Sequence, residues 1–172
     1  MRSYGRCHGH DLRHKGDTHD MSRIRPLDPD DGERLHDVFP ALREGMLSQK
    51  SLTFHARTDH SFVLEGQDGK LKGVTLAQSV WNGVEPELRV AGIWVASEKM
   101  EDTAILLDAV VKSAYDAAVY RLRFEMHEDR TDLASLLKRT GWTHEPLAVY
   151  TAQLGSDGGV LRAAPSRNTG AP

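Results

Sequence analysis

Three strand-like segments followed by one long amphipathic helix occupy the middle of the chain, and this order constrains the fold more than any other feature. The strand-like segments are rich in β-branched and aromatic residues and comprise residues 61–65, 70–81 and 87–95. Two turn sequences separate them, Gly66-Gln67-Asp68-Gly69 and Asn82-Gly83, so we expect an antiparallel meander. Gly92 inside the third segment indicates a bulge or a close backbone approach. Over residues 101–119, apolar side chains recur at helical spacing opposite a charged stripe, which predicts a helix.

Elements on both sides of this unit complete the pattern of an α/β layer fold. Asp28-Pro29 is typical of a helix start, and Leu35, Val38, Phe39 and Leu42 continue at helical spacing. The remaining predicted elements are a strand at 23–27, a second helix at 45–57, a strand at 121–127, a helix at 130–140 closed by Gly141, and a last strand at 147–154. The predicted order is therefore β-αα-βββ-α-β-α-β, a mixed central sheet flanked by helices.

The two ends of the chain differ in composition from this region. Residues 1–20 contain Cys7 and four histidines without hydrophobic periodicity. They could bind a metal ion, but the composition favours a disordered His-rich leader, and Met21 could be the true start. Residues 155–172 are rich in Gly, Pro, Ser and Ala, as expected of a disordered tail. We expect one folded domain over residues 21–154 and no metal site within it.

Charge and hydropathy exclude several classes of protein. The net charge is −3 and the basic residues are dispersed, which argues against nucleic-acid binding. No apolar run approaches the roughly 20 residues needed to cross a bilayer, and one cysteine cannot form an internal disulfide. The expected location is cytoplasmic, with no membrane partner, and the sequence does not indicate an oligomeric state. No Walker A, G-x-G-x-x-G or H-E-x-x-H motif is found.

Several stretches resemble a small uncharacterised bacterial family assigned the GNAT (acyl-CoA N-acyltransferase) fold. They are Phe54-His55-Ala56-Arg57-Thr58, His60-Ser61-Phe62, Leu76-Ala77-Gln78, Val80-Trp81, residues 110–117 and Val119-Tyr120. The order of elements resembles that superfamily over residues 23–154. The resemblance implies that strands 87–95 and 121–127 splay apart to hold the pantetheine arm of acetyl-CoA. The backbone of Ile93, Trp94 and Val95 would then pair with its amides.

The resemblance also implies a pyrophosphate site at the start of the long helix, normally a glycine-rich turn behind a basic residue. Residues 96–102 here contain no glycine, one cation and three carboxylates. Ser97 and Lys99 are the candidate contacts for coenzyme A. We expect Glu98, Glu101 and Asp102 to oppose a diphosphate, and a carboxylate to occupy the helix terminus itself, so the sequence predicts a poor coenzyme A site.

Catalytic candidates come from the same resemblance and from residue type. The family's leaving-group tyrosine, four residues before the pair Gly141-Trp142, is replaced by Leu137. His127 could deprotonate an amine, although its position favours a solvated strand-end histidine. Glu87 and Glu125 could be carboxylate bases or ordinary surface charges. A pocket for an anionic acceptor could form from His55, Arg57 and His60, whereas the aromatic residues Trp81, Trp94 and Tyr115 are typical of a core.

Two hypotheses follow. The first is a divergent N-acyltransferase that moves an acetyl group from acetyl-CoA to an amine, with a degenerate pyrophosphate loop and no tyrosine acid. The second is a non-catalytic GNAT-fold protein that binds another small-molecule ligand or a partner. Fold alone does not decide between them.

Overall fold

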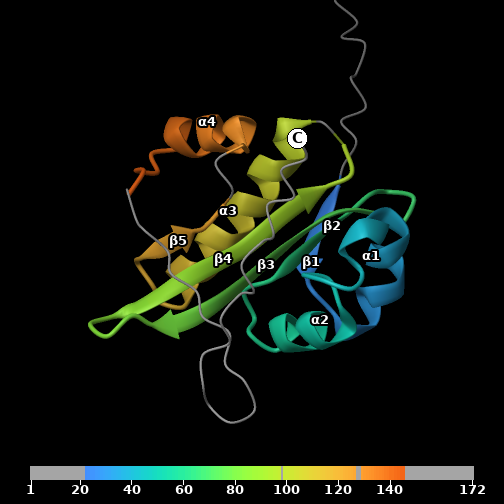
Figure 1. Cartoon of the computed structure of the whole chain (residues 1–172), viewed down its shortest axis with the longest axis horizontal. Coiled ribbons are helices and arrows are strands. Elements are labelled where there is room, and N and C mark those ends of the chain that lie inside the picture. The colour runs from blue at the N-terminus through green and yellow to red at the C-terminus, as the bar shows by residue number, and fades with distance from the viewer. Residues whose placement is uncertain (1–21, 98, 127–128, 146–172) are drawn as a thin grey trace, which may run out of the picture. The chain divides into compact units, whose positions relative to one another are not determined.

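The structure is a computed structural model that describes residues 22–97, 99–126 and 129–145 (Figure 1). The described residues up to Leu136 form one compact unit, and those from Leu137 onward belong to a second. The sheet and the features discussed below lie in the first unit unless stated. None of the helices within the described ranges is long and apolar enough to cross a membrane.

In the described ranges the sheet has five strands, in the order β1-β2-β3-β4-β5. They are β1 (Arg23–Pro26), β2 (Phe62–Glu65), β3 (Leu71–Trp81), β4 (Pro86–Val95) and β5 (Leu122–Phe124). The first four pair antiparallel, and β5 runs parallel to β4. The predicted mixed sheet and meander are confirmed, although β5 is shorter than the strand expected over residues 121–127. The strand expected over residues 147–154 lies outside the described residues.

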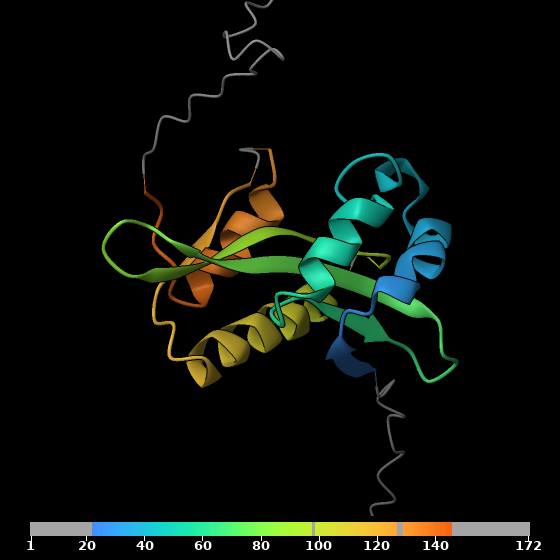
Figure 2. The same ribbon diagram turned by 90° about the horizontal axis from the view of Figure 1, so that it is seen from below.

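Helices cover both faces of this sheet. They are α1 (Gly32–Val38), α2 (Gln49–Ala56), α3 (Met100–Asp116) and α4 (Thr131–Arg139), with short 3-10 helices η1 (Pro29–Asp31) and η2 (Pro40–Leu42). Figure 2 shows α3 on one face of the sheet and α1 and α2 on the other. The α1/α2 face carries one core cluster, whose buried members are Leu27, Leu35, Leu47, Leu52, Val63, Leu71, Val74 and Leu76. On the opposite face α3 packs closely, because a Cβ built on Gly73 would lie 3.0 Å from Leu106 Cδ1.

The single first helix expected as far as Leu42 is wrong, because the structure divides it. Asp28 caps the start as predicted, with its Oδ1 accepting from the backbone N–H of Asp30 at 2.9 Å. However, α1 ends at Val38 and Phe39 has φ −127° and ψ 61°. The cause is Pro40, because the ring of a proline disfavours helical backbone angles at the residue before it, here Phe39. The second helix likewise begins only at Gln49.

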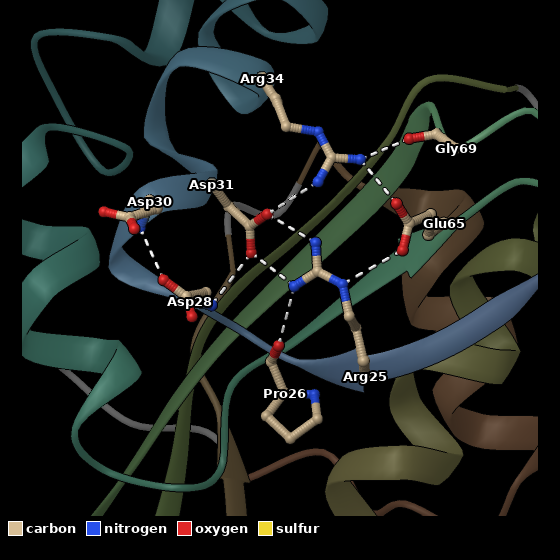
Figure 3. Close-up of polar contacts among 8 residues, drawn as sticks. All are labelled: Arg25, Pro26, Asp28, Asp30, Asp31, Arg34, Glu65 and Gly69. Atoms are coloured by element: carbon tan, nitrogen blue, oxygen red, sulfur yellow. Dashed lines mark hydrogen bonds and ion pairs between the residues drawn. The ribbon is translucent and has the colours of Figure 1, made fainter.

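An ion-pair network ties the N-terminal elements to the sheet (Figure 3). Arg25 on β1 contacts Asp31 of η1 at 2.6 Å and Glu65 of β2 at 3.2 Å. Arg34 of α1 contacts the same two carboxylates at 3.2 and 2.7 Å and also donates to the carbonyl of Gly69. Two arginines and two carboxylates therefore hold β1, η1, α1 and β2 together.

Candidate functional site

A bulge interrupts β4 next to Gly92, where the sequence predicted a bulge or a close backbone approach. Leu76 of β3 pairs with Gly92, whereas the next residue, Ala77, pairs with Val90. Ala91 is therefore an extra residue on β4. A Cβ on Gly92 would lie 2.2 Å from the indole ring of Trp94, so this position also has the close approach that glycine permits.

Beyond the bulge, the backbone of β4 faces a side that β5 does not cover. The N–H of Ala96 donates to the carbonyl of Lys72 at 2.7 Å, so Ala96 faces β3. Because backbone polar groups alternate in direction along a strand, Ile93 and Val95 face away from β3. On that side β5 pairs with β4 only over residues 88–90. The pairing of β4 with β5 thus ends at Val90 and Phe124. The splay of the two strands beyond this point, which the resemblance implied, stays a prediction.

A cleft of about 240 Å³ lies at this part of β4. Its lining comes from α3 and α4 as well as β4, and includes Phe39, Ile93, Trp94, Val95, Ser97, Lys99, Met100, Thr103, Arg130 and Asp132. All five residues predicted to contact coenzyme A are in this set. The structure therefore brings together the residues of β4 and the turn before α3 that the sequence singled out.

The sequence did not indicate the contribution of α4 to this cleft. Arg130 and Asp132 line it at the start of α4, with Arg130 Nε 3.5 Å from Asp132 Oδ1. Since β4 and β5 are parallel, the helices that follow them begin at the same edge of the sheet, and this topology is the signal that could have located the two residues. With Lys99, the charged residues that line the cleft in the described part of the chain are two cations and one carboxylate.

The carboxylates of α3 lie differently from what the sequence suggested. Met100 and Thr103, one helical turn apart, line the cleft, while Glu101 and Asp102 are not among its lining residues. Glu101 is exposed, and Asp102 accepts a hydrogen bond from Ser97 Oγ at 2.6 Å. Glu101 is therefore directed to solvent, whereas the charge of Asp102 lies next to Ser97, a residue of the cleft.

The start of α3 has backbone donors next to the cleft. Its N-cap residue, Lys99, makes no side-chain hydrogen bond to the first turn, and the carboxylate of Asp102 is bonded to a hydroxyl rather than to these amides. The expectation that a carboxylate fills the helix terminus is not met by Asp102. Glu98, the third carboxylate of that prediction, lies outside the described residues.

Glu87 lies apart from this cleft and is not the surface charge that the sequence allowed. Its side chain is fully buried, Arg89 Nε donates to its Oε1 at 2.9 Å, and Arg121 Nε lies 3.3 Å from its Oε2. Burial alone would raise the pKa of Glu87, but the hydrogen bond from Arg89 and the charges of Arg123 and Arg89 lower it. A carboxylate held in the ionised form in this way is a weak base.

The predicted acceptor cluster does not assemble. His55 and His60 are buried, and Arg57 is exposed to solvent. Burial is the main cause that lowers the pKa of both histidines, so neither contributes positive charge at neutral pH. None of the three lines the cleft.

Hydrogen bonds fix the imidazole of His60 between two elements. Its Nδ1 lies 2.8 Å from Ser113 Oγ on α3, and its Nε2 lies 3.0 Å from Ser79 Oγ on β3. Ser113 Oγ donates to the carbonyl of Asp59, so it accepts from Nδ1–H, and Nε2 accepts from Ser79. His60 therefore connects α3 to the sheet.

The remaining catalytic candidates are only partly placed. His127 lies outside the described residues. Leu137, in the second unit, is a buried residue of α4. Two described tyrosines, Tyr115 and Tyr120, are exposed and do not line the cleft. The core positions expected for Tyr115 and Trp81 are wrong, since they are 72% and 69% exposed.

Trp94 is half-buried and packs against the α1/α2 core cluster while it also lines the cleft. Glu125, the other carboxylate considered as a base, is exposed. Within the described part of the chain, no group of three or more His, Cys, Asp or Glu side chains is arranged to hold a metal ion.

Comparisons with known proteins agree with this architecture. Residues 17–163 match the model of a family described as "Protein of unknown function (DUF1999)". The crystal structure of wild-type TTHA1254 from Thermus thermophilus is 36% identical, with 78% of this chain and 98% of that chain covered and a TM-score of 0.64. A comparison with curated proteins found no match.

More distant solved structures share the fold. Aminoglycoside N-acetyltransferase AAC(6')-Iy in complex with CoA is 16% identical over 77% of this chain and 94% of that chain, with a TM-score of 0.62. Ribosomal-protein-alanine N-acetyltransferase from Brucella melitensis biovar Abortus 2308 is 15% identical over 78% and 99%, with a TM-score of 0.58. The GNAT fold that the resemblance implied is thereby confirmed.

Proposed function

Because the chain belongs to the family described as "Protein of unknown function (DUF1999)" and has the GNAT fold, we propose that it is a divergent N-acyltransferase that uses acyl-CoA and an amine. One observation carries the proposal. Beyond its bulge, β4 borders a cleft that the first turns of α3 and α4 also line.

The backbone of β4 suits the pantetheine arm of the donor. Ile93 and Val95 have their N–H and C=O groups directed away from β3, and both residues line the cleft. An extended molecule with two amides can pair with such a strand edge as an added strand would. The same pairing would place the thioester close to the bulge at Gly92.

The cations of the cleft suit the phosphates of the donor. Lys99 and Arg130 line it together with one carboxylate, Asp132. Unit charges about 4 Å apart near a surface interact by about 1–4 kcal/mol, so each of these two cations would attract a phosphate group. The backbone amides at the start of α3 add donors and the positive end of a helix dipole. Without a glycine-rich turn the affinity is expected to be modest.

Transfer requires the amine nitrogen to attack the thioester carbonyl carbon, after which the carbon–sulfur bond breaks and the thiolate leaves. The amine proton passes to a base. Neither of the two described tyrosines lines the cleft, so we assign the proton that the thiolate takes up to solvent. Among the described lining residues Asp132 is a poor base, since the backbone amide of Leu133 lowers its pKa. We assign the base to His127, which follows β5 in the sequence.

Isothermal titration of the full chain with coenzyme A and acetyl-CoA tests the donor site. The wild type should bind with micromolar affinity, and the double variant Lys99→Glu, Arg130→Glu should bind at least tenfold more weakly. The matched control, Arg57→Glu with Lys112→Glu, changes the same charge at exposed positions away from the cleft and should leave the affinity unchanged. Absence of heat and of thermal stabilisation at millimolar coenzyme A would remove the proposal.

A second candidate function is a GNAT-fold protein that binds a ligand without acyl transfer. It is favoured by Leu137 at the position of the family's tyrosine and by the lowered pKa values of Asp132 and Glu87. Release of free thiol from acetyl-CoA, measured with a panel of amines, separates the two functions. Amine-dependent release that is lost in His127→Gln supports the transferase; coenzyme A binding with no release for any amine supports the binding protein.

A further inference from the structure

Two hydroxyl groups and an imidazole form a continuous chain of hydrogen bonds between β3 and α3. Ser79 Oγ lies 3.0 Å from Nε2 of His60, and Nδ1 of the same ring lies 2.8 Å from Ser113 Oγ. None of these three residues lines the cleft beside Ile93. The acyl transfer proposed above therefore does not involve them.

The members of this chain differ in their access to solvent. The imidazole of His60 is only 8% exposed, Ser113 is half-buried, and Ser79 is exposed. Val74 and Leu76 belong to the core cluster on the α1/α2 face. Because side chains alternate between the faces of a sheet, Ser79 lies on the opposite face, which α3 covers. A molecule from solvent can thus reach a hydroxyl group that is bonded to a buried ring.

The inner end of the chain determines where its protons lie. Ser113 Oγ donates to the carbonyl of Asp59 at 3.3 Å, so it accepts from Nδ1–H of His60. Nε2 of the ring then has a lone pair and accepts the hydroxyl proton of Ser79. Burial lowers the pKa of His60, although the charge of Asp59 opposes this. The ring is therefore neutral at pH 7 and can take up a proton.

A link between α3 and the sheet does not by itself require the outer hydrogen bond. His60 directly precedes Ser61 and β2, so its bond to Ser113 already connects α3 to the sheet. Nε2 faces an exposed position, where water could satisfy it. The bond from Ser79 to Nε2 is thus an addition to the structural link.

This arrangement is the one that activates a serine. A hydroxyl group is a weak nucleophile unless an adjacent base accepts its proton and a third group orients that base. His60 is the base, and Ser113 fixes its tautomer, as the carboxylate does in a Ser-His-Asp triad. Ser113 brings no charge to the imidazolium that forms, but the negative charge of Asp59 acts on the same ring.

The backbone of Ser79 offers a donor for the oxygen of a carbonyl group under attack. The N–H of Asn82 donates to the carbonyl of Glu85 at 3.1 Å across the β3–β4 turn. Since backbone groups alternate in direction along a strand, the N–H of Ser79 is directed away from β4. On that side, the pairing of β2 with β3 ends at Phe62 and Thr75, before it reaches Ser79. Backbone N–H groups stabilise the negative charge that develops on a carbonyl oxygen.

Trp81 lies two residues after Ser79, on the same face of β3, and is 69% exposed. An indole ring exposed to this extent can pack against an apolar group of a substrate. An ester is the expected class, because an alkoxide leaves a carbonyl carbon more easily than the anion of an amine does.

We propose that Ser79 is a nucleophile activated by His60 and that it hydrolyses small carboxylic esters with an apolar group. Ser79 Oγ attacks the carbonyl carbon while Nε2 of His60 takes its proton, and the bond from this carbon to the alcohol oxygen breaks. The alkoxide receives the proton from His60. Water then attacks the acyl-serine by the same route, which releases the carboxylic acid and restores Ser79. Ser113 is a positioning residue. The site is independent of acyl-CoA binding and of the proposed function.

A fluorophosphonate probe tests the nucleophile in the full wild-type chain. An activated serine oxygen displaces fluoride from phosphorus, and mass spectrometry of the digested protein gives the labelling rate at each serine. Ser135 is the internal control, because it is also exposed but its hydroxyl donates to the carbonyl of Thr131 at 2.7 Å. Ser79 should be labelled about a hundredfold faster, since a positioned base contributes roughly 10²–10⁴-fold. Equal rates at the two serines would overturn the proposal.

Hydrolysis of p-nitrophenyl acetate, measured above the rate in buffer, tests the substrate class. Ser79→Ala should abolish hydrolysis, whereas the matched variant Ser135→Ala should retain it. His60→Gln should lower both the hydrolysis rate and the labelling of Ser79 about a hundredfold. Absence of hydrolysis by the wild type, or equal hydrolysis by the wild type and Ser79→Ala, would refute the esterase.

Two further positions separate orientation from substrate binding. Ser113→Ala should slow the labelling of Ser79 severalfold, and Ser113→Thr, which keeps the hydroxyl group, should restore it. Equal labelling in these two variants would exclude Ser113 as a positioning residue. Trp81→Ala should raise KM for p-nitrophenyl butyrate severalfold with little change in kcat, and an unchanged KM would exclude Trp81 from the substrate site.

Discussion

Arg25 and Asp31 form a two-pronged ion pair, in which Nη1 of Arg25 donates to Oδ2 of Asp31 at 2.7 Å and Nη2 donates to Oδ1 at 2.6 Å. The side chain of Asp31 is only 4% exposed. The same carboxylate accepts from the backbone N–H of Asp28 at 3.0 Å and lies 3.2 Å from Arg34. One buried carboxylate thus fixes the path of the chain from β1 into α1.

Replacement of this carboxylate should be costly. Asp31→Asn leaves Arg25 and Arg34 with only one of the two carboxylates that they contact, Glu65. Loss of one partner of a buried pair typically lowers the free energy of unfolding by about 3 kcal/mol. Urea unfolding measures this loss. The matched control is Asp68→Asn, an exposed carboxylate 3.8 Å from Lys70, which should change stability by less than about 0.5 kcal/mol. Similar losses in the two variants would contradict the role of Asp31.

The ion pair between Arg25 and Asp31 also predicts how the free energy of unfolding depends on pH. Burial alone would raise the pKa of Asp31, but hydrogen bonds from Arg25 and the Asp28 amide, with the nearby arginine charges, lower it below its usual 3.8. The unfolded chain therefore takes up the proton first, and the stabilisation is complete above the unfolded pKa and is lost as the pH falls through the lower folded pKa. Unfolding curves from pH 6 to pH 2 should show this decline, and Asp31→Asn should flatten it. An unchanged slope in the variant would exclude Asp31 as its source.

Glu87 allows a comparable prediction with a different signature. Glu87→Gln removes the charge that holds three arginines together, so we expect a loss of about 3 kcal/mol. Part of this loss is repulsion between the three arginines, whose side chains are partly exposed. Added salt screens such repulsion, so it should reduce the loss of stability. Denaturation at low and high ionic strength tests this. Glu85→Gln is the control, since its half-exposed carboxylate lies 3.5 Å from Arg121, and it should cost much less. A salt-independent loss in Glu87→Gln would argue against arginine repulsion.

Local sequence signals predicted much of the fold. The turn glycines Gly69 and Gly83 have φ values of +75° and +100°, a backbone conformation that residues with a side chain rarely adopt. The isolated Gly92 marks the bulge, where there is no space for a Cβ atom. The break at Pro40 was present in the sequence, but helical spacing of apolar residues continued across it. A periodic pattern does not register the steric effect of one proline on the residue before it.

Features that depend on distant parts of the chain could not be predicted in the same way. Strand alternation places Glu87 on one face, but two of the arginines that contact its buried carboxylate, Arg121 and Arg123, lie more than thirty residues later. Trp81 and Tyr115 have core-like residue types, yet they lie at the C-terminal ends of β3 and α3 and are exposed. The cleft residues of β4 came from the family resemblance rather than from any pattern, and Arg130 joins them only through the parallel arrangement of β4 and β5.

The buried histidines predict a second dependence on pH, well above that of Asp31. Burial lowers the pKa of His60 and His55 below the usual 6.5, so both are neutral in the folded state. The unfolded chain becomes protonated first, and stability should fall as the pH drops through 6.5 toward the lower folded pKa. His60→Gln should flatten the decline between pH 7.5 and pH 5. His144→Gln, at a solvent-exposed histidine, should preserve it, and an equal slope in wild type and His60→Gln would refute this origin.

The contact between Gly92 and Trp94 connects the bulge to the cleft and gives the last prediction. A Cβ at position 92 would lie 2.2 to 2.9 Å from three atoms of the indole ring, so Gly92→Ala forces the ring of Trp94 to turn. Overpacking of this kind costs about 1–3 kcal/mol, which urea unfolding measures. The displaced ring should also shift tryptophan emission and weaken coenzyme A binding.

Two variants decide whether this effect passes through the indole ring. Gly45→Ala is a suitable control, because its added Cβ meets only Leu42 O at 3.8 Å and should change neither stability nor emission appreciably. Gly92→Ala combined with Trp94→Leu should be more stable than Gly92→Ala alone, since leucine lacks the ring atoms that collide with the new methyl group. If the second substitution gave no rescue, the cost would come from the bulge backbone, and Trp94 would not couple the bulge to the cleft.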